Sequence, residues 1–355
     1  MTDWHESRTN TYEYYLVDPN TWMNKRKLGD IKPGGSITRD ATTDTLIAAS
    51  LSFDGDDLGE FYVRIYLVTI QNGIRDRKVL GTFLAQTSST SFDGKLSTPS
   101  VSAYSPLLEL REVSPPLGYN IKKNQRILPI VTKSIQENSR LQVVPTSAPN
   151  DNLEVDFVAD PSDTWLDFNL GLIKRANHYL DIDEMGKIMF APNQSVESIQ
   201  PVFTYNDDDA SILYPEITKE IDIYGIPNTL EVVYSGDDHY LVATAVNDDP
   251  NSIVSTVSRG RVVFQREDNP DILGKPTQRE LDEYAEKKLK ELSEVNCQLT
   301  YQHGFNDVRI FDCVRLNYVR AGLTNIKALV IKQTINCDTE CKVDETVVYK
   351  KKLWG

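Results

Sequence analysis

Histidine and neighbouring carboxylates are the side chains of this chain that could act in acid–base catalysis or bind a metal. The sequence has four histidines, and His178 lies close to Asp181, Asp183 and Glu184, near the expected end of a helix. A helix C-terminus favours a protonated imidazole, so this group could serve as a general base or as a metal ligand. No nucleophile or second ligand accompanies it in the sequence. We therefore expect a surface histidine that is stabilised by the helix dipole and the nearby acids.

Short acidic clusters are the second kind of candidate, because carboxylate oxygens are the ligands that calcium prefers. Three such clusters occur in turn contexts: Asp54/Asp56/Asp57, Asp207/Asp208/Asp209 and Asp248/Asp249. None has the regular spacing of ligands with a distal glutamate that a calcium loop requires. Aspartate and glycine form turns readily, so we expect solvated turns at all three places.

The cysteines form a third candidate group, and all four lie in the C-terminal part of the chain: Cys297, Cys313, Cys337 and Cys341. In a reducing cytoplasm we expect free thiols that pack as small hydrophobic groups. A disulfide stays open as an alternative. So does a metal site in which Cys337 and Cys341 join Cys297, Cys313 or His303, although no paired C-x2-C motif supports it.

Catalytic and nucleotide-binding motifs are absent from the sequence. It contains no G-x-S-x-G elbow, no Walker loop, no H-E-x-x-H motif and no dinucleotide fingerprint. A cell-wall hydrolase would need two carboxylates in different environments or a metal-bound water, and no specific pair indicates either. We therefore expect no enzyme activity, no cofactor and no metal.

Aromatic side chains could line a glycan-binding groove. The candidates lie on expected strands: Tyr12, Tyr14, Tyr15, Tyr62 and Tyr66. At strand spacing these residues are explained more simply by a sheet face that packs on a core. Of the tryptophans, Trp4, Trp22 and Trp354 lie towards the ends of the chain and Trp165 is on a buried helix face. A receptor- or glycan-binding module is kept as an alternative function.

Composition excludes several classes of protein. The chain has 355 residues, of which 40% are hydrophobic and 25% charged, as in folded proteins of two or three domains. The net charge of −14 and the isoelectric point of about 4.8 argue against general nucleic-acid binding and against an anionic membrane surface. No apolar stretch approaches the ~20 residues of a spanning helix, and residues 1–6 lack the features of a secretory signal.

The elements of secondary structure that would position these side chains are mostly strands. Residues 60–70 are the strongest strand prediction, and Gln71-Asn-Gly73 closes them with a tight-turn signal. Short strands at regular spacing indicate an antiparallel sandwich or barrel. The segment 114–118, with two prolines and a glycine, and Asp207-Asp-Asp209 punctuate the chain. They predict a β-rich domain over 1–115, an α/β domain over 116–214 and a second β-rich domain over 215–355.

Three helices are expected among these strands. One covers residues 127–138, with Pro129 in its first turn. A second begins at Asp160-Pro161, where Asp160 caps the helix and an apolar stripe follows from Trp165. The third covers 277–293: Thr277 and Glu280 form a capping box, and this isolated helix has an apolar stripe on one face and Glu and Lys on the other.

Several motifs occur in a fixed order along the C-terminal part of the chain. They are Asn247-Asp-Asp-Pro-Asn-Ser252, Ser258-Arg-Gly-Arg-Val-Val-Phe264, the helix with Ala285 and Leu289, Leu299-Thr-Tyr-Gln-His303, and Phe311-Asp-Cys-Val-Arg-Leu316. Further motifs precede them: Gly35-Ser-Ile-Thr-Arg-Asp40, Leu80-Gly-Thr-Phe-Leu84, Val101-Ser-Ala-Tyr104, Thr164-Trp-Leu-Asp167 and Gly186-Lys-Ile-Met-Phe-Ala-Pro192.

This succession resembles the baseplate hub proteins of long-tailed bacteriophages and related contractile particles. Thr300, Tyr301 and His303 match the T-Y-x-H strand of that family. At its G-D-x-V-x-L turn, Phe311 stands where the family usually has glycine, and the remaining positions match. The resemblance covers most of the chain, and the order of the motifs carries it.

The resemblance implies a structural role and a mainly β fold: two tube-like antiparallel β-barrels, an inserted α/β domain and one peripheral helix. Hub proteins of this kind form a homotrimeric ring that joins the hexameric tail tube to a central spike or tip. The implied partners are other copies of the chain, a tail tube or distal tail protein, the spike or tip protein, other baseplate proteins and a tape-measure protein. The implied location is the virion tail, assembled in the cytoplasm of the host. An acidic lumen of such a ring would repel DNA phosphates.

Overall fold

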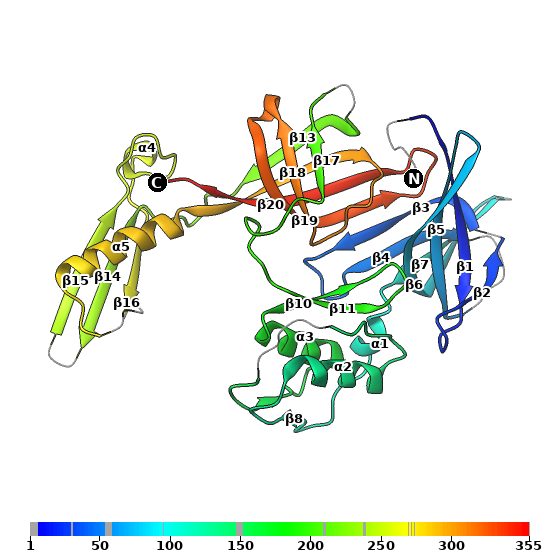
Figure 1. Ribbon diagram of the computed structural model, residues 1–355, viewed down its shortest axis with the longest axis horizontal. Coiled ribbons are helices and arrows are strands. Elements are labelled where there is room, and N and C mark those ends of the chain that lie inside the picture. Colours follow the sequence, from blue (N-terminus) through cyan, green and yellow to red (C-terminus); the bar gives the residue numbers. More distant parts are fainter. Residues whose placement is uncertain are drawn as a thin grey trace. The chain divides into compact units, whose positions relative to one another are not determined.

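The structure of the chain is a computed structural model that describes residues 6–29, 31–53, 59–94, 96–146, 152–208, 211–236, 239–268, 270, 272 and 274–354. Its contacts divide the chain into two compact units (Figure 1). We call Met1–Ile217 with Tyr301–Thr346 the large unit, and Thr218–Thr300 with Val347–Gly355 the small unit. The fold is mainly β with few helices, as expected. No helix among the described residues is long and apolar enough to cross a membrane.

Thirteen strands form one sheet, and the division between the units falls within β13, β17 and β20. The strands are β1 (Thr9–Val17), β2 (Asn24–Leu28), β3 (Ile31–Asp40), β4 (Ile47–Phe53), β5 (Phe61–Gln71), β6 (Ile74–Asp93), β7 (Leu96–Tyr104), β12 (Phe203–Asn206), β13 (Leu213–Ile221), β17 (Glu294–Gly304), β18 (Cys313–Tyr318), β19 (Leu323–Asn336) and β20 (Lys342–Lys352). Their order is β13-β17-β20-β19-β3-β4-β7-β6-β5-β1-β2, with β18 paired to β12 and β19.

The strand predicted over residues 60–70 is confirmed as β5. Residues 62–69 are all buried, so both faces of this strand are covered. The hairpin that follows has Asn72 at φ 50° and Gly73 at φ 77°. Two consecutive left-handed residues are what a two-residue hairpin turn requires, and the Asn-Gly pair supplies them with little strain.

The two closed barrels that we expected are not found among the described residues. The strand order runs from β13 to β2 without returning to its first member, and its β19–β3 pair joins strands from the two ends of the sequence. The register of this pair is antiparallel, with Ile335 opposite Ile37. The two units therefore cut across the three consecutive domains expected at 1–115, 116–214 and 215–355. Those domain bounds stay a prediction.

Helices gather in one part of the large unit, where α1 (Leu108–Arg111), α2 (Ile127–Asn138) and α3 (Trp165–Arg175) lie next to β10 (His178–Ile182) and β11 (Ile188–Pro192) (Figure 1). A small ladder of β8 (Asn120–Ile121) and β9 (Phe157–Val158) completes this part. The predicted helix over 127–138 is confirmed as α2.

The start of α3 differs from the prediction. Thr164, and not Asp160, caps the helix: its side chain accepts from the Asp167 N–H, and the Asp167 carboxylate accepts from the Thr164 N–H in return. The N–H of Asp160 instead donates to the Asp163 carboxylate at 2.9 Å, which forms a separate turn before the helix. A reciprocal capping box satisfies two free N–H groups at once, which a single aspartate cap does not.

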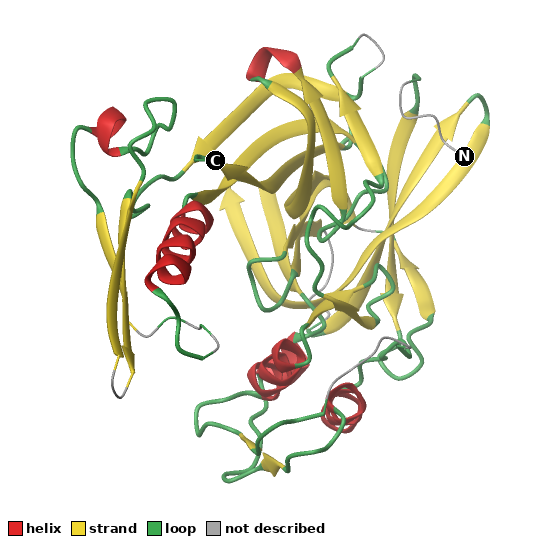
Figure 2. Ribbon diagram, turned by 60° about the vertical axis from the view of Figure 1, so that its left-hand side comes forward, coloured by secondary structure: helices red, strands yellow, loops and turns green. Residues whose placement is uncertain are grey.

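The small unit consists of a three-stranded sheet and one long helix. Its strands are β14 (Thr229–Gly236), β15 (His239–Val246) and β16 (Phe264–Asp268), with the short helix α4 (Thr256–Arg259) between β15 and β16. The predicted capped helix is confirmed as α5 (Gln278–Leu292), with the capping box of Thr277 and Glu280. Figure 2 shows α5 beside this sheet, where Leu281, Ala285 and Leu289 are fully buried against Leu230 and Val232.

Candidate functional site

A cluster of buried polar side chains lies in the large unit around Glu345, which is 0% exposed. Tyr301 donates its hydroxyl to Glu345 Oε1 at 2.5 Å, and Gln333 Nε2 donates to Glu345 Oε2 at 2.6 Å. His303 Nε2 lies 3.4 Å from the same Oε2. We call these four residues, together with Tyr205, the Glu345 cluster. Four strands supply its members: β12, β17, β19 and β20.

Strand alternation explains how the cluster forms. Every second side chain of β17 is buried, which places Tyr301 and His303 on the inner face. In β20 the buried positions include Val343, Glu345 and Val347. A carboxylate therefore occupies a position where the pattern calls for an apolar side chain. Burial of a charge is tolerated only when it is paired and hydrogen-bonded, and the cluster provides both.

His303 and Tyr205 extend the network. His303 Nδ1 lies 2.7 Å from the carbonyl oxygen of Gly304, and because a carbonyl can only accept, this nitrogen carries a proton. His303 Nε2 lies 3.2 Å from the Tyr205 hydroxyl, which also accepts from Asn306 Nδ2 at 2.8 Å. All these side chains are at most 5% exposed. Tyrosine, histidine and glutamate could exchange protons in this geometry, but their side chains are buried and bonded to one another, so we interpret the cluster as structural.

The ionisation of Glu345 follows from its contacts. Burial alone would raise the pKa of this carboxyl, but the charge of His303 and the hydrogen bonds from His303, Tyr301 and Gln333 together lower the pKa below its ordinary value of 4.5. The pKa of Tyr301 is raised, mainly by burial and to a smaller extent by the charge of Glu345. The carboxylate is therefore the stable form in the folded chain.

The lowered pKa of Glu345 predicts a pH dependence of stability. Between the folded pKa and the unfolded value near 4.5 the unfolded chain binds more protons, so the stabilisation by the carboxylate is complete above this window and lost as the pH falls through it. We expect the difference in unfolding free energy between the wild type and Glu345→Gln to shrink as the pH falls below about 4.5. Urea unfolding at each pH measures it. A difference that stays constant down to pH 3 would contradict the prediction.

An ion-pair network adjoins the cluster through Arg39, whose Nη1 donates to Gln333 Oε1 at 3.3 Å. Glu184 accepts from Arg39 Nη2 at 3.3 Å and forms an ion pair with Arg309, whose Nε lies 2.7 Å from Glu184 Oε1. Arg309 also pairs with Asp181 at 3.3 Å. These residues border a pocket of about 420 Å³, at whose rim Lys78 pairs with Asp307. The charges of its walls are thus matched in pairs.

The expected surface position of His178 is wrong. His178 is the first residue of β10, and the pairing of β10 with β11 turns its ring inward, so that it is only 6% exposed. Its Nδ1 lies 2.6 Å from the Ala176 carbonyl. Asp181 and Glu184 bind Arg309 instead, as described above, and Asp183 accepts from the Lys187 N–H at 2.7 Å. The structure thus does not bring the histidine and these acids together as one site.

The acidic clusters lie in turns where the structure describes them. Asp249 accepts from the Asn251 N–H at 2.8 Å, and Asp207 lies 3.8 Å from Arg320. The cluster from Asp54 to Asp57 and the last member of the second cluster, Asp209, lie outside the described residues. In the described part of the chain no group of three or more histidines, cysteines, aspartates or glutamates is placed to hold a metal ion.

The four cysteines are buried free thiols. Burial is the largest of the effects that raise the pKa of Cys337. It is also the main reason that the pKa of Cys341 is raised to about 11. Tyr12 lies beside this pair, with its hydroxyl 2.9 Å from the Asp338 carbonyl. A thiol that is buried and protonated reacts slowly with electrophiles.

We therefore expect the cysteines to resist alkylation in the folded chain. At pH 8 iodoacetamide should modify none of them within minutes, whereas all four should be modified after unfolding in guanidinium. Mass spectrometry counts the added groups, and free glutathione in the same tube controls for the reagent. Rapid labelling of Cys337 or Cys341 in the folded chain would show that these thiols are open to solvent.

The aromatic candidates mostly belong to the core. Tyr14, Tyr62 and Tyr66 are at most 7% exposed, as expected for a packed sheet face. Trp22 and Trp165 are each 5% exposed. Trp354 packs on the core of the small unit, and Trp4 lies outside the described residues.

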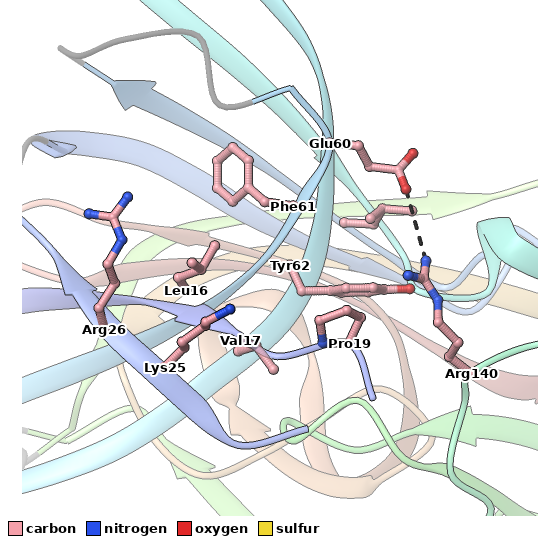
Figure 3. A pocket seen from close by; sticks show the side chains of 10 residues that line it. Leu16, Val17, Pro19, Lys25, Arg26, Glu60, Phe61, Tyr62 and Arg140 are labelled. Atoms are coloured by element: carbon pink, nitrogen blue, oxygen red, sulfur yellow. Dashed lines mark ion pairs between the residues drawn. The ribbon is translucent and has the colours of Figure 1, made fainter. Parts of the chain in front are cut away.

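A second pocket, of about 270 Å³, lies beside β2 in the large unit (Figure 3). Its lining combines apolar and charged side chains: Leu16, Val17, Pro19, Lys25, Arg26, Glu60, Phe61, Tyr62, Leu84 and Arg140. In Figure 3, Lys25 and Arg26 lie on one side and the ion pair of Glu60 and Arg140 on the other. Sequence reasoning missed this pocket, because β1, β2, β5 and the segment before α3 come together only in the folded chain.

Comparison with solved structures finds this fold in tail proteins. The tail protein from Neisseria meningitidis MC58 has a TM-score of 0.62 at 11% identity, and the match covers 96% of this chain and 97% of that one. The 43 kDa tail protein of prophage MuSo2 from Shewanella oneidensis has a TM-score of 0.62 at 11% identity, covering 95% and 98%. A chain of the Francisella PdpA–VgrG complex has a TM-score of 0.58 at 10% identity, covering 98% of this chain and 53% of that one.

No family model matches the sequence, and no curated protein matches it significantly. At these low identities the likeness is one of fold, and it extends over almost the whole chain. The sequence resemblance to phage baseplate proteins is thereby confirmed at the level of structure: this chain has the fold of phage tail proteins.

Proposed function

We propose that the chain is a structural hub subunit of a tail baseplate, in a phage or a phage-like contractile particle. The observation that carries the proposal is the fold shared with tail proteins over 95% or more of this chain. In the proposed assembly three copies form a ring that joins the tail tube to a central spike or tip. The chain acts by binding other proteins and has no catalytic role.

The open sheet supports an assembling role. Within the described residues its order ends at β13 and at β2, each with a neighbour on one side only. Exposed strand edges must be protected or paired, and pairing between subunits is one way to cover them. In the proposal, neighbouring copies in the ring cover the β13 edge.

The net charge supports the proposed lumen. With 52 acidic and 38 basic residues, a ring of three copies carries a large excess of negative charge. An acidic inner wall repels DNA phosphates and limits adhesion during ejection. A ring whose channel wall is net basic would refute this part of the proposal without affecting the ring itself.

The test is the mass and shape of the assembled chain. The purified chain, alone and mixed with the tube and spike proteins of the same particle, is examined by native mass spectrometry and electron microscopy. We expect a trimer that appears as a ring, either alone or once its partners are added. A chain that stays monomeric with both partners present would overturn the proposal. Sugar-array binding tests the glycan-binding alternative in parallel.

A further inference from the structure

The strands at one end of the large sheet are unusually basic. The segments 9–28 and 61–78, which contain β1, β2 and β5, have seven basic and three acidic residues, in a chain of net charge −14. Lys25, Arg26 and Lys27 follow one another on β2, and all three are exposed. Within the described residues β2 pairs with β1 alone, so its outer edge presents backbone N–H and C=O groups.

The three basic side chains of β2 differ in the contacts that they form. Lys27 donates to Glu13 at 2.7 Å, and Arg75 donates to the same oxygen at 2.8 Å. The side chain of Arg26 forms no hydrogen bond or ion pair with any part of the chain that the structure describes. Lys25 lies at a bulge, where Leu16 pairs with Arg26 and Val17 with Asn24. The charge of Lys25 contributes to lowering the pKa of nearby Asp18, so the charge of Arg26 is the one left for a partner.

The pocket next to these two residues has an apolar floor. Val17, Tyr62 and Leu84 are each at most 2% exposed and line the 270 Å³ cavity together with half-buried Leu16 (Figure 3). Its volume and lining suit one large apolar side chain. Lys25 and Arg26 stand at its rim, so an apolar group in the pocket lies close to two positive charges.

Hydrogen bonds hold the far wall of the pocket in place. The Tyr62 hydroxyl donates to the Glu109 carboxylate, which also binds Arg140 Nη2 at 2.6 Å. The Arg140 carbonyl accepts from Trp22 Nε1 at 2.8 Å. A preformed wall lowers the entropic cost of binding, because few side chains must become ordered.

We propose that the edge of β2 and this pocket bind an extended acidic segment of a partner protein by strand addition. The backbone of the segment pairs with β2, an acidic side chain meets Lys25 and Arg26, and a large apolar side chain fills the pocket. Main-chain pairing with pockets for alternate side chains is an established mode of peptide recognition. A nucleic acid would use a longer basic track.

This inference does not rest on the trimeric hub, because the surface lies within one copy of the large unit. The test uses the full chain and a fluorescein-labelled peptide in which glutamate alternates with leucine, isoleucine and phenylalanine. Fluorescence anisotropy measures its affinity. We expect saturable binding that weakens with salt, and no binding of the same peptide with lysine in place of glutamate. Hydrogen exchange should show slower exchange at residues 24–28 when the peptide is bound.

The variants separate this site from general charge attraction. Lys25→Glu with Arg26→Glu should weaken binding by at least about tenfold. The matched control is Lys350→Glu with Lys351→Glu, which makes the same change of net charge at two adjacent exposed lysines elsewhere in the chain. It should leave the affinity within about twofold. Circular dichroism checks that both variants fold, and native mass spectrometry checks their assembly separately.

Three outcomes would overturn the inference. One is that the acidic peptide does not bind, which is the result expected if the lysines and the bulge serve only to keep the edge unpaired. Another is an equal loss of affinity in both double variants, or protection from exchange at a segment other than 24–28. The third is displacement of the peptide by a single-stranded DNA oligonucleotide with the same dependence on Lys25 and Arg26, which would assign the surface to nucleic acid.

Discussion

Replacing Glu345 with alanine is expected to lower the unfolding free energy of the large unit by about 3–5 kcal/mol. The carboxylate is fully buried and accepts hydrogen bonds from Tyr301 and Gln333. Its removal leaves these donors and the His303 ring buried without their partner, and it opens a cavity in the core. The loss exceeds the value of the contacts themselves, because an unsatisfied buried polar group also costs its desolvation.

Urea unfolding followed by circular dichroism measures the effect, and two further variants interpret it. Glu340→Ala removes a carboxylate from the surface, where its side chain is 60% exposed and pairs with Lys342. This control should cost less than about 1 kcal/mol. Glu345→Gln keeps the volume and some hydrogen bonds and should fall between the two. If Glu345→Ala and Glu340→Ala have equal effects, the Glu345 cluster is not a structural centre.

The parts of the fold that local patterns determine were predictable. The β5 strand is a long run of β-branched and aromatic residues that ends in Asn72-Gly73. The α5 helix carries its own capping box and apolar stripe. In both cases the signal lies within about fifteen consecutive residues, so no knowledge of the tertiary structure is needed.

The parts that depend on distant pairing were not predictable. The pairing of β19 with β3 joins residues almost 300 positions apart, and no pattern in either strand specifies it. His178 was misplaced for a related reason, because its burial depends on the pairing of β10 with β11.

The sequence around Glu345 contains a pattern from which a buried charge could have been predicted. Val343, Glu345 and Val347 alternate along one strand, so a charged residue stands at an inward position. Arg64 gives a second example, within the apolar run from Tyr62 to Val68. A charge at an inward position of a strand predicts a buried partner, although it does not identify that partner.

Replacing Arg64 is the second substitution for which we expect a large loss of stability. Its side chain is 2% exposed, and its guanidinium donates four hydrogen bonds to neutral acceptors. These are Thr82 Oγ1 at 2.9 Å, Asn24 Oδ1 at 3.0 Å, and the carbonyls of Trp22 and Met185 at 3.1 Å each. One side chain thus connects β5 with β6, with the segment before β2 and with the turn between β10 and β11. Arg64→Ala should cost about 3–5 kcal/mol of unfolding free energy.

Arg64→Met tests whether this cost comes from lost volume or from lost donors. Methionine fills most of the space but donates nothing, so the four acceptors lose this donor, and two of them, Thr82 Oγ1 and the Trp22 carbonyl, lose a buried hydrogen bond. We expect Arg64→Met to remain at least about 2 kcal/mol less stable than the wild type. Arg320→Met is the matched control, because Arg320 is 79% exposed and lies 3.8 Å from Asp207, and its cost should stay below about 1 kcal/mol. Recovery of wild-type stability in Arg64→Met would show that Arg64 acts through packing alone, since only the volume would then have mattered.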